Sequence, residues 1–236
     1  MDEATKTNIV RGPGFADLYL RGKVIDIGCG RDPVCSWAEP FDLEHGDAGQ
    51  IDMLREIEAY DAVHSSHCLE HMPDPADALV RWWRLVKPGG YLIIVVPDED
   101  LYEQGFFPSR FNDDHKATFR MGGQTSWSPV SHDIVALISS LEGAEIIDAR
   151  IQDQHYDWSL RHHPYQAAEN KPWQRYKRRR KLLRILAKPL GRAKRDALTR
   201  EFEDRWFREH GIPVDQTARE ALAQIQVIAR KIKTGS

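Results

Sequence analysis

The feature that most constrains this chain is a short apolar run ending in two glycines, Val24-Ile-Asp-Ile-Gly-Cys-Gly30. An apolar run of this length is typical of a buried parallel strand. Gly28 and Gly30 let the backbone turn sharply and approach a ligand closely, because neither residue has a Cβ. A helix start after such a turn offers free N–H groups to an anionic group. The segment therefore predicts a strand followed by a cradle for a nucleotide-type cofactor.

The third glycine of a dinucleotide motif is missing. A dinucleotide fold uses G-x-G-x-x-G, in which the last glycine allows close packing over a pyrophosphate. Here the third position is Pro33, so a pyrophosphate is disfavoured. S-adenosylmethionine has no phosphate and carries a carboxylate and an ammonium. The amides of the loop around Cys29 would take the carboxylate, and Asp26 would take the ammonium.

Length and composition favour one domain over residues 1–236, because the chain is 41% hydrophobic and 29% charged. It has no run of eighteen apolar residues and a polar N-terminus, so we expect a cytoplasmic protein. Three cysteines without C-x-x-C spacing argue against disulfides. The ten histidines are scattered, and we expect no metal site.

The net charge of −3 hides a strong asymmetry. Residues 171–195 hold twelve Lys or Arg and no acid, so the rest of the chain carries −15. We predict a helical basic insertion over 156–212. Within it, 173–194 contacts an anionic membrane surface or an anionic substrate, or else packs its leucines on the domain. Nucleic acid is the least favoured partner, although Trp173 and Tyr176 could stack on bases, because no RNA-binding module accompanies the charges.

The order of predicted elements indicates an α/β fold with a parallel sheet. We predict a helix over 75–86, stopped by Lys87-Pro-Gly-Gly90, a helix within 52–59, and a helix from Ser131 to Leu141 capped by Ser131. The predicted strands are 24–27, 41–43, 61–66, 91–96, 143–151 and 223–229.

Three segments together carry a resemblance to a known family. Gly28-Cys-Gly30, Leu69-Glu-His71 after a strand, and Lys87-Pro-Gly-Gly90 before a strand resemble class I S-adenosylmethionine-dependent methyltransferases of the type 11 small-molecule branch. Residues 98–116 resemble a group of bacterial methyltransferases associated with envelope glycans. The resemblance implies a Rossmann-like, seven-stranded sheet in the order 3-2-1-4-5-7-6, with the last strand antiparallel and the basic insertion before it.

The same resemblance implies roles for particular residues. Asp26, Gly28 and Gly30 would hold the methionine end of the cofactor, and Asp42 would accept hydrogen bonds from both ribose hydroxyls. The remaining cofactor contacts would come from Asp47 and Ala48 beside the adenine and from Ser66 and His67 on the methyl-donor side. Only about a dozen residues separate Gly30 from Asp42, so we expect a shortened first helix or a loop there.

Methyl transfer to a hydroxyl or amine also needs a group that takes a proton. We expect His67 to be that base and His115 to be the second candidate. Residues 98–127 would form a substrate lid, whose Arg110, Asn112 and Lys116 would bind a phosphate or carboxylate of a small molecule. The expected reaction is O-methylation of a sugar or glycan precursor. Its alternatives are N-methylation of a phospho-amine and a non-catalytic protein that only binds the cofactor.

Overall fold

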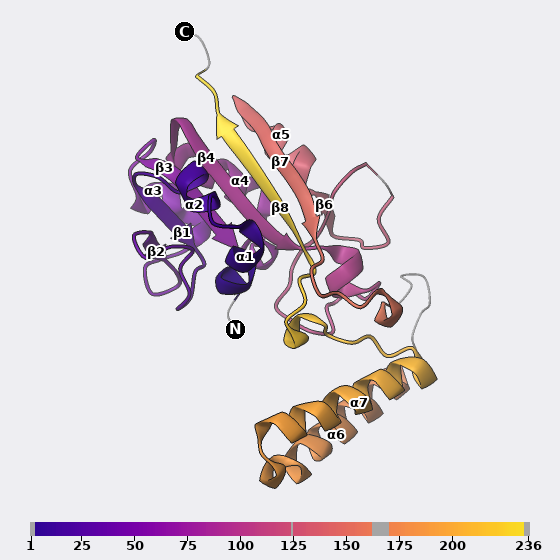
Figure 1. The fold of residues 1–236 in the computed structure, drawn as a ribbon. Helices are drawn as coiled ribbons and strands as arrows, with labels where there is room; N and C mark the ends of the chain where they lie inside the picture. The colour runs from indigo at the N-terminus through magenta and orange to yellow at the C-terminus, as the bar shows by residue number, and fades with distance from the viewer. Residues whose placement is uncertain (1–2, 124, 162–169, 234–236) are drawn as a thin grey trace.

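The structure, a computed structural model, describes residues 3–123, 125–161 and 170–233. Its centre is a six-stranded sheet in the order β2-β1-β3-β4-β8-β7 (Figure 1). The strands are β1 (Val24–Ile27), β2 (Glu39–Phe41), β3 (Tyr60–Ser66), β4 (Val86–Pro97), β7 (Ala144–Gln152) and β8 (Gln224–Lys231). A separate two-stranded sheet pairs β5 (Thr118–Arg120) with β6 (Ser131–Asp133).

The main sheet is mostly parallel, as the sequence predicts. Strands β2, β1, β3 and β4 pair in parallel, while β8 runs antiparallel to both β4 and β7. The mixed α/β, Rossmann-like architecture is therefore confirmed. The expected count of seven strands is wrong, because the sheet of the described residues has six.

The missing strand is the one expected outside β2. Residues 42–59 form the 3₁₀ turn η1 (Ala48–Gln50) and the short helix α3 (Ile51–Leu54) instead. The carbonyl of Phe41 accepts from Gly28 N and so points toward β1. Because successive residues of a strand direct their backbone groups to opposite sides, those of Pro40 point to the outer edge. Proline has no N–H to offer there, which makes β2 a natural edge strand.

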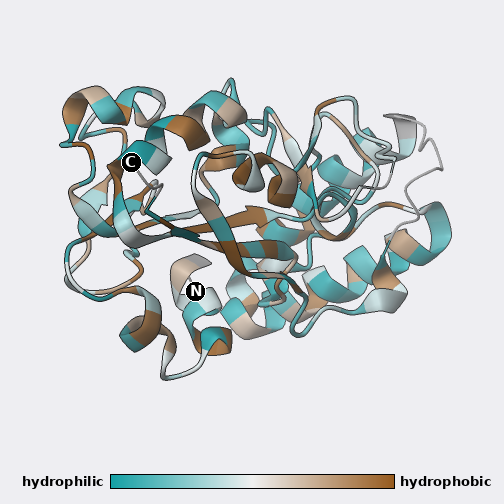
Figure 2. Ribbon diagram, turned by 90° about the horizontal axis from the view of Figure 1, so that it is seen from above, coloured by the Kyte–Doolittle hydropathy of each residue, from teal (hydrophilic) through white to brown (hydrophobic). Residues whose placement is uncertain are grey.

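Helices cover both faces of the sheet (Figures 1 and 2). Alternate residues of β4 supply the two cores: Leu92 and Ile94 belong to the larger cluster, whereas Ile93 packs with Phe15 and Leu20 on the other face. The helices on the sheet are α1 (Glu3–Arg11), α2 (Phe15–Tyr19), α4 (Pro75–Leu85) and α5 (Ile134–Ser139). Short turns of helix are η2 (Leu69–His71), η3 (Glu99–Glu103), η4 (Trp158–Leu160), η5 (Lys188–Leu190) and η6 (Thr217–Arg219).

Two helix starts show how the sequence sets the element boundaries. Asp74 caps α4 by accepting hydrogen bonds from Ala76 N and Asp77 N, both at 3.0 Å. Asp133 caps α5, so the prediction of Ser131 as the cap was wrong. Ser131 lies in β6, and the carboxylate two residues later is the stronger acceptor at a helix N-terminus.

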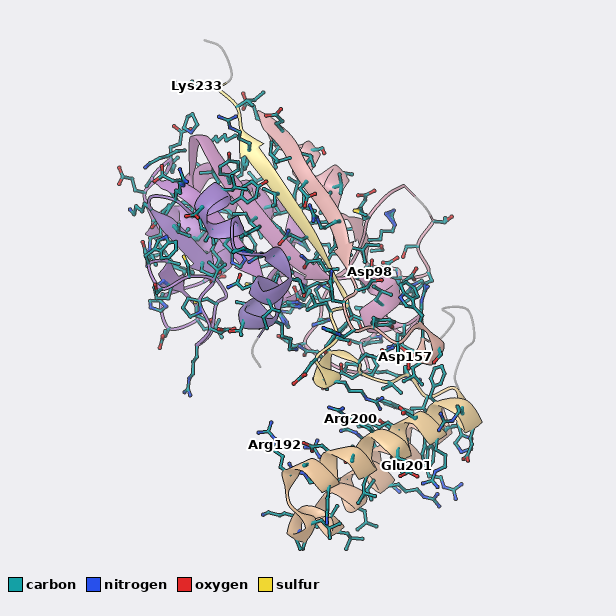
Figure 3. All side chains as sticks on the ribbon, in the orientation of Figure 1. Asp98, Asp157, Arg192, Arg200, Glu201 and Lys233 are labelled. Carbon is teal, nitrogen blue, oxygen red and sulfur yellow. The ribbon has the colours of Figure 1, made fainter. Side chains whose placement is uncertain are left out.

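The basic segment forms a helical hairpin of α6 (Asn170–Leu186) and α7 (Arg192–His210). It lies beyond the end of the sheet marked by Asp98 (Figure 3). Tyr176, Phe202, Trp206 and Ile212 form a small core of its own. Leu182, Ile185, Leu186 and Leu190 are each more than half exposed, so the hypothesis that the leucines pack on the domain is wrong for these four.

Candidate active site

The glycine turn follows β1 directly, at the carboxyl ends of the parallel strands. Gly28 has φ +74°, and a Cβ on it would lie 2.5 Å from Cys68 Cβ, so only glycine fits. Its N–H donates to Phe41 O at 2.7 Å. Gly30 also has a positive φ, but nothing lies within 4 Å of a Cβ built there. Burial raises the pKa of Cys29 to about 11, so the residue between the glycines stays a neutral thiol. The turn is thus packed from below and open above Gly30.

Asp26 points into the protein beneath this turn. Its side chain is 1% exposed; Oδ2 accepts from Val34 N at 2.6 Å, and Oδ1 lies 2.6 Å from His64 Nδ1. Arg11 Nη2 lies 3.0 Å from His64 Nε2. Because a guanidinium can only donate, Nε2 must accept, and the imidazole is therefore neutral. Burial also lowers the pKa of His64, which favours the neutral ring. These contacts give Asp26 a positioning role and leave its predicted contact with the cofactor untested.

Asp42 connects the end of β2 to the glycine turn. Its Oδ2 accepts from Gly30 N and its Oδ1 from Leu43 N, both at 2.7 Å. The side chain is partly exposed, so lone pairs remain for further donors. Asp47 is exposed and caps η1 through Gly49 N, while Ala48 O accepts from the Trp82 indole at 2.9 Å. The segment predicted to face the adenine is therefore held by α4 through Trp82.

Ser66 and His67 follow at the end of β3. The Ser66 hydroxyl is buried, and it has no hydrogen-bond partner among the described residues. His67 has φ +54°, and its Nε2 lies 2.9 Å from Gln224 Oε1. Its Nδ1 lies 3.4 Å from Glu70 Oε1. Because both ring nitrogens face oxygen acceptors, the geometry favours a positioning role for His67 over that of a free base.

His115 is enclosed rather than exposed at a pocket mouth. Its side chain is 3% exposed, and Nδ1 lies 2.6 Å from Glu103 Oε1. On the other side, its Nε2 lies 3.9 Å from Glu70 Oε1. The ring also packs against Tyr102 and His71, with centroids at 5.3 Å and 5.0 Å. The roles of His67 and His115 as proton acceptors therefore remain predictions.

A family model, described as methyltransferase domain, matches residues 13–188, about three quarters of the chain. The chain belongs to this family. The match runs through the glycine turn, both strand ends and the first half of the basic hairpin. No curated protein matches.

Solved structures similar to this methyltransferase share little sequence with it. A SAM-dependent methyltransferase from Archaeoglobus fulgidus is 16% identical, with 96% of this chain and 93% of that chain covered and a TM-score of 0.48. The YcgJ protein from Bacillus subtilis is 12% identical, with 99% of this chain and 100% of that chain covered and a TM-score of 0.47. Phosphoethanolamine N-methyltransferase 2 from Haemonchus contortus is 14% identical, with 80% of this chain and 37% of that chain covered and a TM-score of 0.37.

The three predicted substrate residues of the methyltransferase do not lie together. Arg110 is packed between Phe106 and Trp173, with its Cζ 3.8 Å and 4.8 Å from the ring centroids. Asn112 Oδ1 accepts from Asp114 N within the loop itself. Lys116 is exposed, and its Nζ donates to His71 O at 2.7 Å. Arg110 also lines a cavity against α6.

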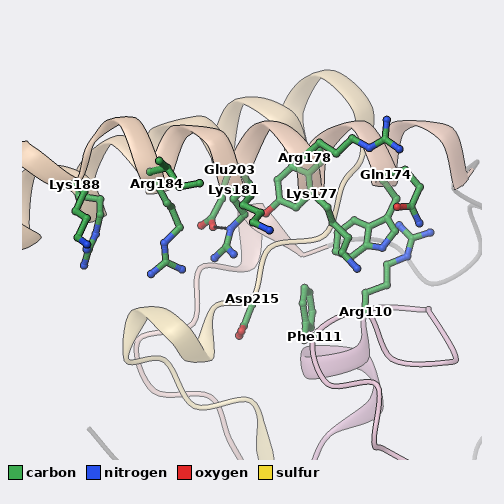
Figure 4. Close-up of a pocket in the computed structure, with 15 residues that line it drawn as sticks. Arg110, Phe111, Gln174, Lys177, Arg178, Lys181, Arg184, Lys188, Glu203 and Asp215 are labelled. Atoms are coloured by element: carbon green, nitrogen blue, oxygen red, sulfur yellow. Dashed lines mark hydrogen bonds and ion pairs between the residues drawn. The ribbon is translucent and has the colours of Figure 1, made fainter.

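That cavity lies between Arg110 and helix α6 and has a volume of about 820 Å³ (Figure 4). Both of its acids are already engaged: Glu203 accepts from Arg180 and Arg219, and Asp215 caps the Thr217 turn. Among the described residues, no ion pair reaches Lys181, Arg184 or Lys188, which point into the cavity. Its basic lining consists of Arg110, Lys177, Arg178, Arg180, Lys181, Arg184, Lys188 and Arg195.

Asp98, directly after β4, is the most perturbed acid at the strand ends. Its side chain is 5% exposed, and burial raises its pKa to about 6. Oδ1 accepts from Asp100 N and Leu101 N at the start of η3. The neighbouring Glu99 is buried as well and accepts from Thr118 and Ser126. These two acids fix the base of the predicted lid.

Sequence reasoning overlooked two parts of this site. The interaction of Gln224 with His67 joins residues that are far apart in the chain, and the alternation in β8 only indicated a strand. The cavity wall from α6 was visible as the basic run, but nothing in the sequence indicated that Arg110 would face it. The one available signal was the basic run itself, because cations in a stretch without acids have no ion-pair partners within that stretch and can bind an anion instead.

Proposed function

We propose that the protein is an S-adenosylmethionine-dependent methyltransferase that methylates a hydroxyl of an anionic small molecule, namely a sugar or glycan precursor. The observation that carries this proposal is the glycine turn, closed beneath by Cys68 and open above Gly30, with the Asp42 carboxylate at its side. Family membership supports methyl transfer as the reaction.

The residues present fit the cofactor. The open space above Gly30 accommodates its methionine end, and the buried Ser66 hydroxyl without a described partner can bind a polar group there. Asp42 would accept hydrogen bonds from the ribose hydroxyls, and Asp47 and Ala48 would lie beside the adenine. When bound, S-adenosylmethionine supplies a methyl group on a sulfonium. The protein's residues orient both partners and exclude water around the turn.

The basic cavity indicates the charge of the acceptor. The Arg110 Nη1 is buried and has no hydrogen-bond partner among the described residues. The side chain as a whole is half-buried, and burial lowers the pKa of its guanidinium. A partly buried guanidinium whose Nη1 has no described partner, beside the α6 cations, favours a phosphate or carboxylate ligand. A sugar phosphate or nucleotide sugar meets this need, and so does the alternative substrate class, a phospho-amine.

Calorimetry and methyl transfer test the proposal. We expect S-adenosylmethionine to bind with one site per chain and NAD not to bind. Labelled methyl transfer should appear with a pool of anionic sugars. In Arg110→Gln we expect the KM for the anionic acceptor to rise about tenfold or more, the usual effect of losing a charged hydrogen-bond donor. Arg175→Gln, an exposed α6 cation outside the cavity, is the matched control.

The outcomes separate the candidate functions. Turnover with phospho-amines and none with sugars would replace O-methylation by N-methylation. Cofactor binding without turnover on either pool would indicate a protein that only binds the cofactor. Binding of NAD in place of S-adenosylmethionine would overturn the proposal altogether.

The exposed apolar face of the hairpin favours a membrane surface as an additional partner. Leu182, Ile185 and Leu186 share one side of α6 by their spacing and are 56–68% exposed. Ile185 also lines the basic cavity. None of the described helices is long and apolar enough to cross a bilayer. We infer that this face rests on an anionic membrane surface, with the cations of α6 around it.

A further inference from the structure

Three potential metal ligands lie together beside the active site. Glu70 and His71 belong to η2, and His115 comes from the loop forty-four residues later; each offers one ligand atom within 4.8 Å of the others. Backbone contacts fix the two segments to each other, because Lys116 N and Ala117 N donate to Glu70 O at 2.8 Å and 3.2 Å. The grouping is therefore part of the fold rather than a chance approach of flexible side chains.

Glu70 is an unusual buried acid. It is 1% exposed, and among the described residues neither carboxylate oxygen accepts a hydrogen bond. The nearest donors are His67 Nδ1 at 3.4 Å and His115 Nε2 at 3.9 Å. A carboxylate enclosed in this way, without a close hydrogen-bond donor on either oxygen, is suited to binding a cation.

The two histidines are oriented as metal ligands are. Glu103 Oε1 lies 2.6 Å from His115 Nδ1, which leaves Nε2 facing Glu70. Asp114 Oδ2 lies 3.0 Å from His71 Nδ1 in the same manner. A carboxylate on the outer nitrogen of a ligating histidine is the usual second layer of contacts around a protein-bound metal.

We propose that Glu70, His71 and His115 bind a divalent transition metal ion, with zinc the first choice. Two imidazoles and a carboxylate suit zinc, with bond lengths of about 2.0–2.2 Å and a fourth position left open. Tetrahedral bonds of that length separate ligand atoms by about 3.4 Å, so the 3.9 Å between His115 Nε2 and Glu70 Oε1 closes with a small shift. The ion would tie the loop carrying Arg110 to the turn after β3. The proposal is independent of the substrate proposed above.

The competing explanation is a proton-sharing network without metal, in which protonated His67 and His115 neutralise Glu70. The two explanations differ in what the Glu70→Gln variant does. Removing the charge should abolish metal binding if the carboxylate is a ligand. In a metal-free network it should change only stability and histidine titration.

The test uses the full chain without a histidine tag, stripped with a chelator and titrated with Co²⁺ as a visible probe. We expect one ion per chain, with visible absorption bands that disappear on adding Zn²⁺. Glu70→Gln and His71→Gln should lose at least about a hundredfold in affinity, while Glu103→Gln should lose about 10–100-fold. His132→Gln, which changes a histidine outside the cluster, is the matched control and should bind Co²⁺ as the wild type does.

Circular dichroism must show that each variant folds. If Glu70→Gln does not fold, His71→Gln decides the matter, because the His71 side chain is 25% exposed and tolerates replacement. A folded wild type that takes up no stoichiometric Co²⁺ overturns the proposal. Equal Co²⁺ affinity in the wild type and His71→Gln overturns it too.

Discussion

Asp42 is the side chain on which the cofactor site most depends, because it bridges the end of β2 and the glycine turn. We expect Asp42→Ala to weaken S-adenosylmethionine binding by about 1–3 kcal/mol, since a charged hydrogen-bond acceptor is lost. Calorimetry measures the change, and Glu44→Ala, an exposed neighbouring acid, is the control. An unchanged dissociation constant in Asp42→Ala would show that the ribose lies elsewhere.

Asp98 makes stability depend on pH in a direction that can be stated in advance. Its pKa is raised from 3.8 to about 6 by burial, so the folded state favours the protonated form. The resulting contribution to stability is present below about pH 4 and is lost as the pH rises through about 6. Asp98→Asn keeps an oxygen for the η3 cap and removes the buried charge.

We therefore expect Asp98→Asn to match the wild type near about pH 4 and to be more stable near about pH 8, by at most about 3 kcal/mol. Urea denaturation at the two pH values measures this difference. Asp100→Asn, at a partly exposed neighbouring acid, should show no comparable gain. A constant difference across the range would mean that Asp98 titrates normally.

At the scale of elements, the turn after β1 packs closely against the turn after β3 at Gly28 and Cys68. We expect Gly28→Ala to lower the free energy of unfolding by at least about 2 kcal/mol, because a methyl group there adds a clash with Cys68 to the strain of a positive φ. Gly30→Ala carries the strain without the clash and should lose about 1 kcal/mol. Urea midpoints compare the two variants, and equal losses would contradict the packing described here.

How far the elements could be predicted depends on whether their signals are local. Helix α4 was predicted to within one residue, because its apolar spacing and the Pro-Gly stop lie in one stretch of chain. The apolar run 91–96 of β4 was predicted too, but the strand begins five residues earlier, at Val86, and includes Lys87-Pro-Gly-Gly90. The seventh strand came only from the family resemblance, and the 42–59 segment is too short and polar to supply it. The pairing of His115 with Glu70 and Glu103 could not be predicted, since it depends on how the loop folds back over η2.

For the whole molecule, the question is why a compact sheet carries a separate basic hairpin. Its aromatic core holds α6 against α7, so the exposed leucines are not needed for folding the hairpin. Residues 171–195 hold twelve cations and no acid. Of these cations, Arg180, Arg192 and Arg195 form ion pairs with acids of α7. A surface that is both basic and apolar matches an anionic bilayer, where the apolar side chains enter the lipid and the cations meet the headgroups.

We expect the protein to sediment with phosphatidylglycerol vesicles at low salt and not with phosphatidylcholine vesicles. Binding should weaken as salt rises, because the attraction is partly electrostatic. The double variant Ile185→Glu/Leu186→Glu should lose most binding, whereas Ile147→Glu/Ile151→Glu, which places the same two charges at exposed positions of β7, should not. Salt-sensitive binding that the double variant retains would make the cations alone responsible. Vesicle binding absent at every salt concentration, together with retention of RNA, would assign the hairpin to nucleic acid instead.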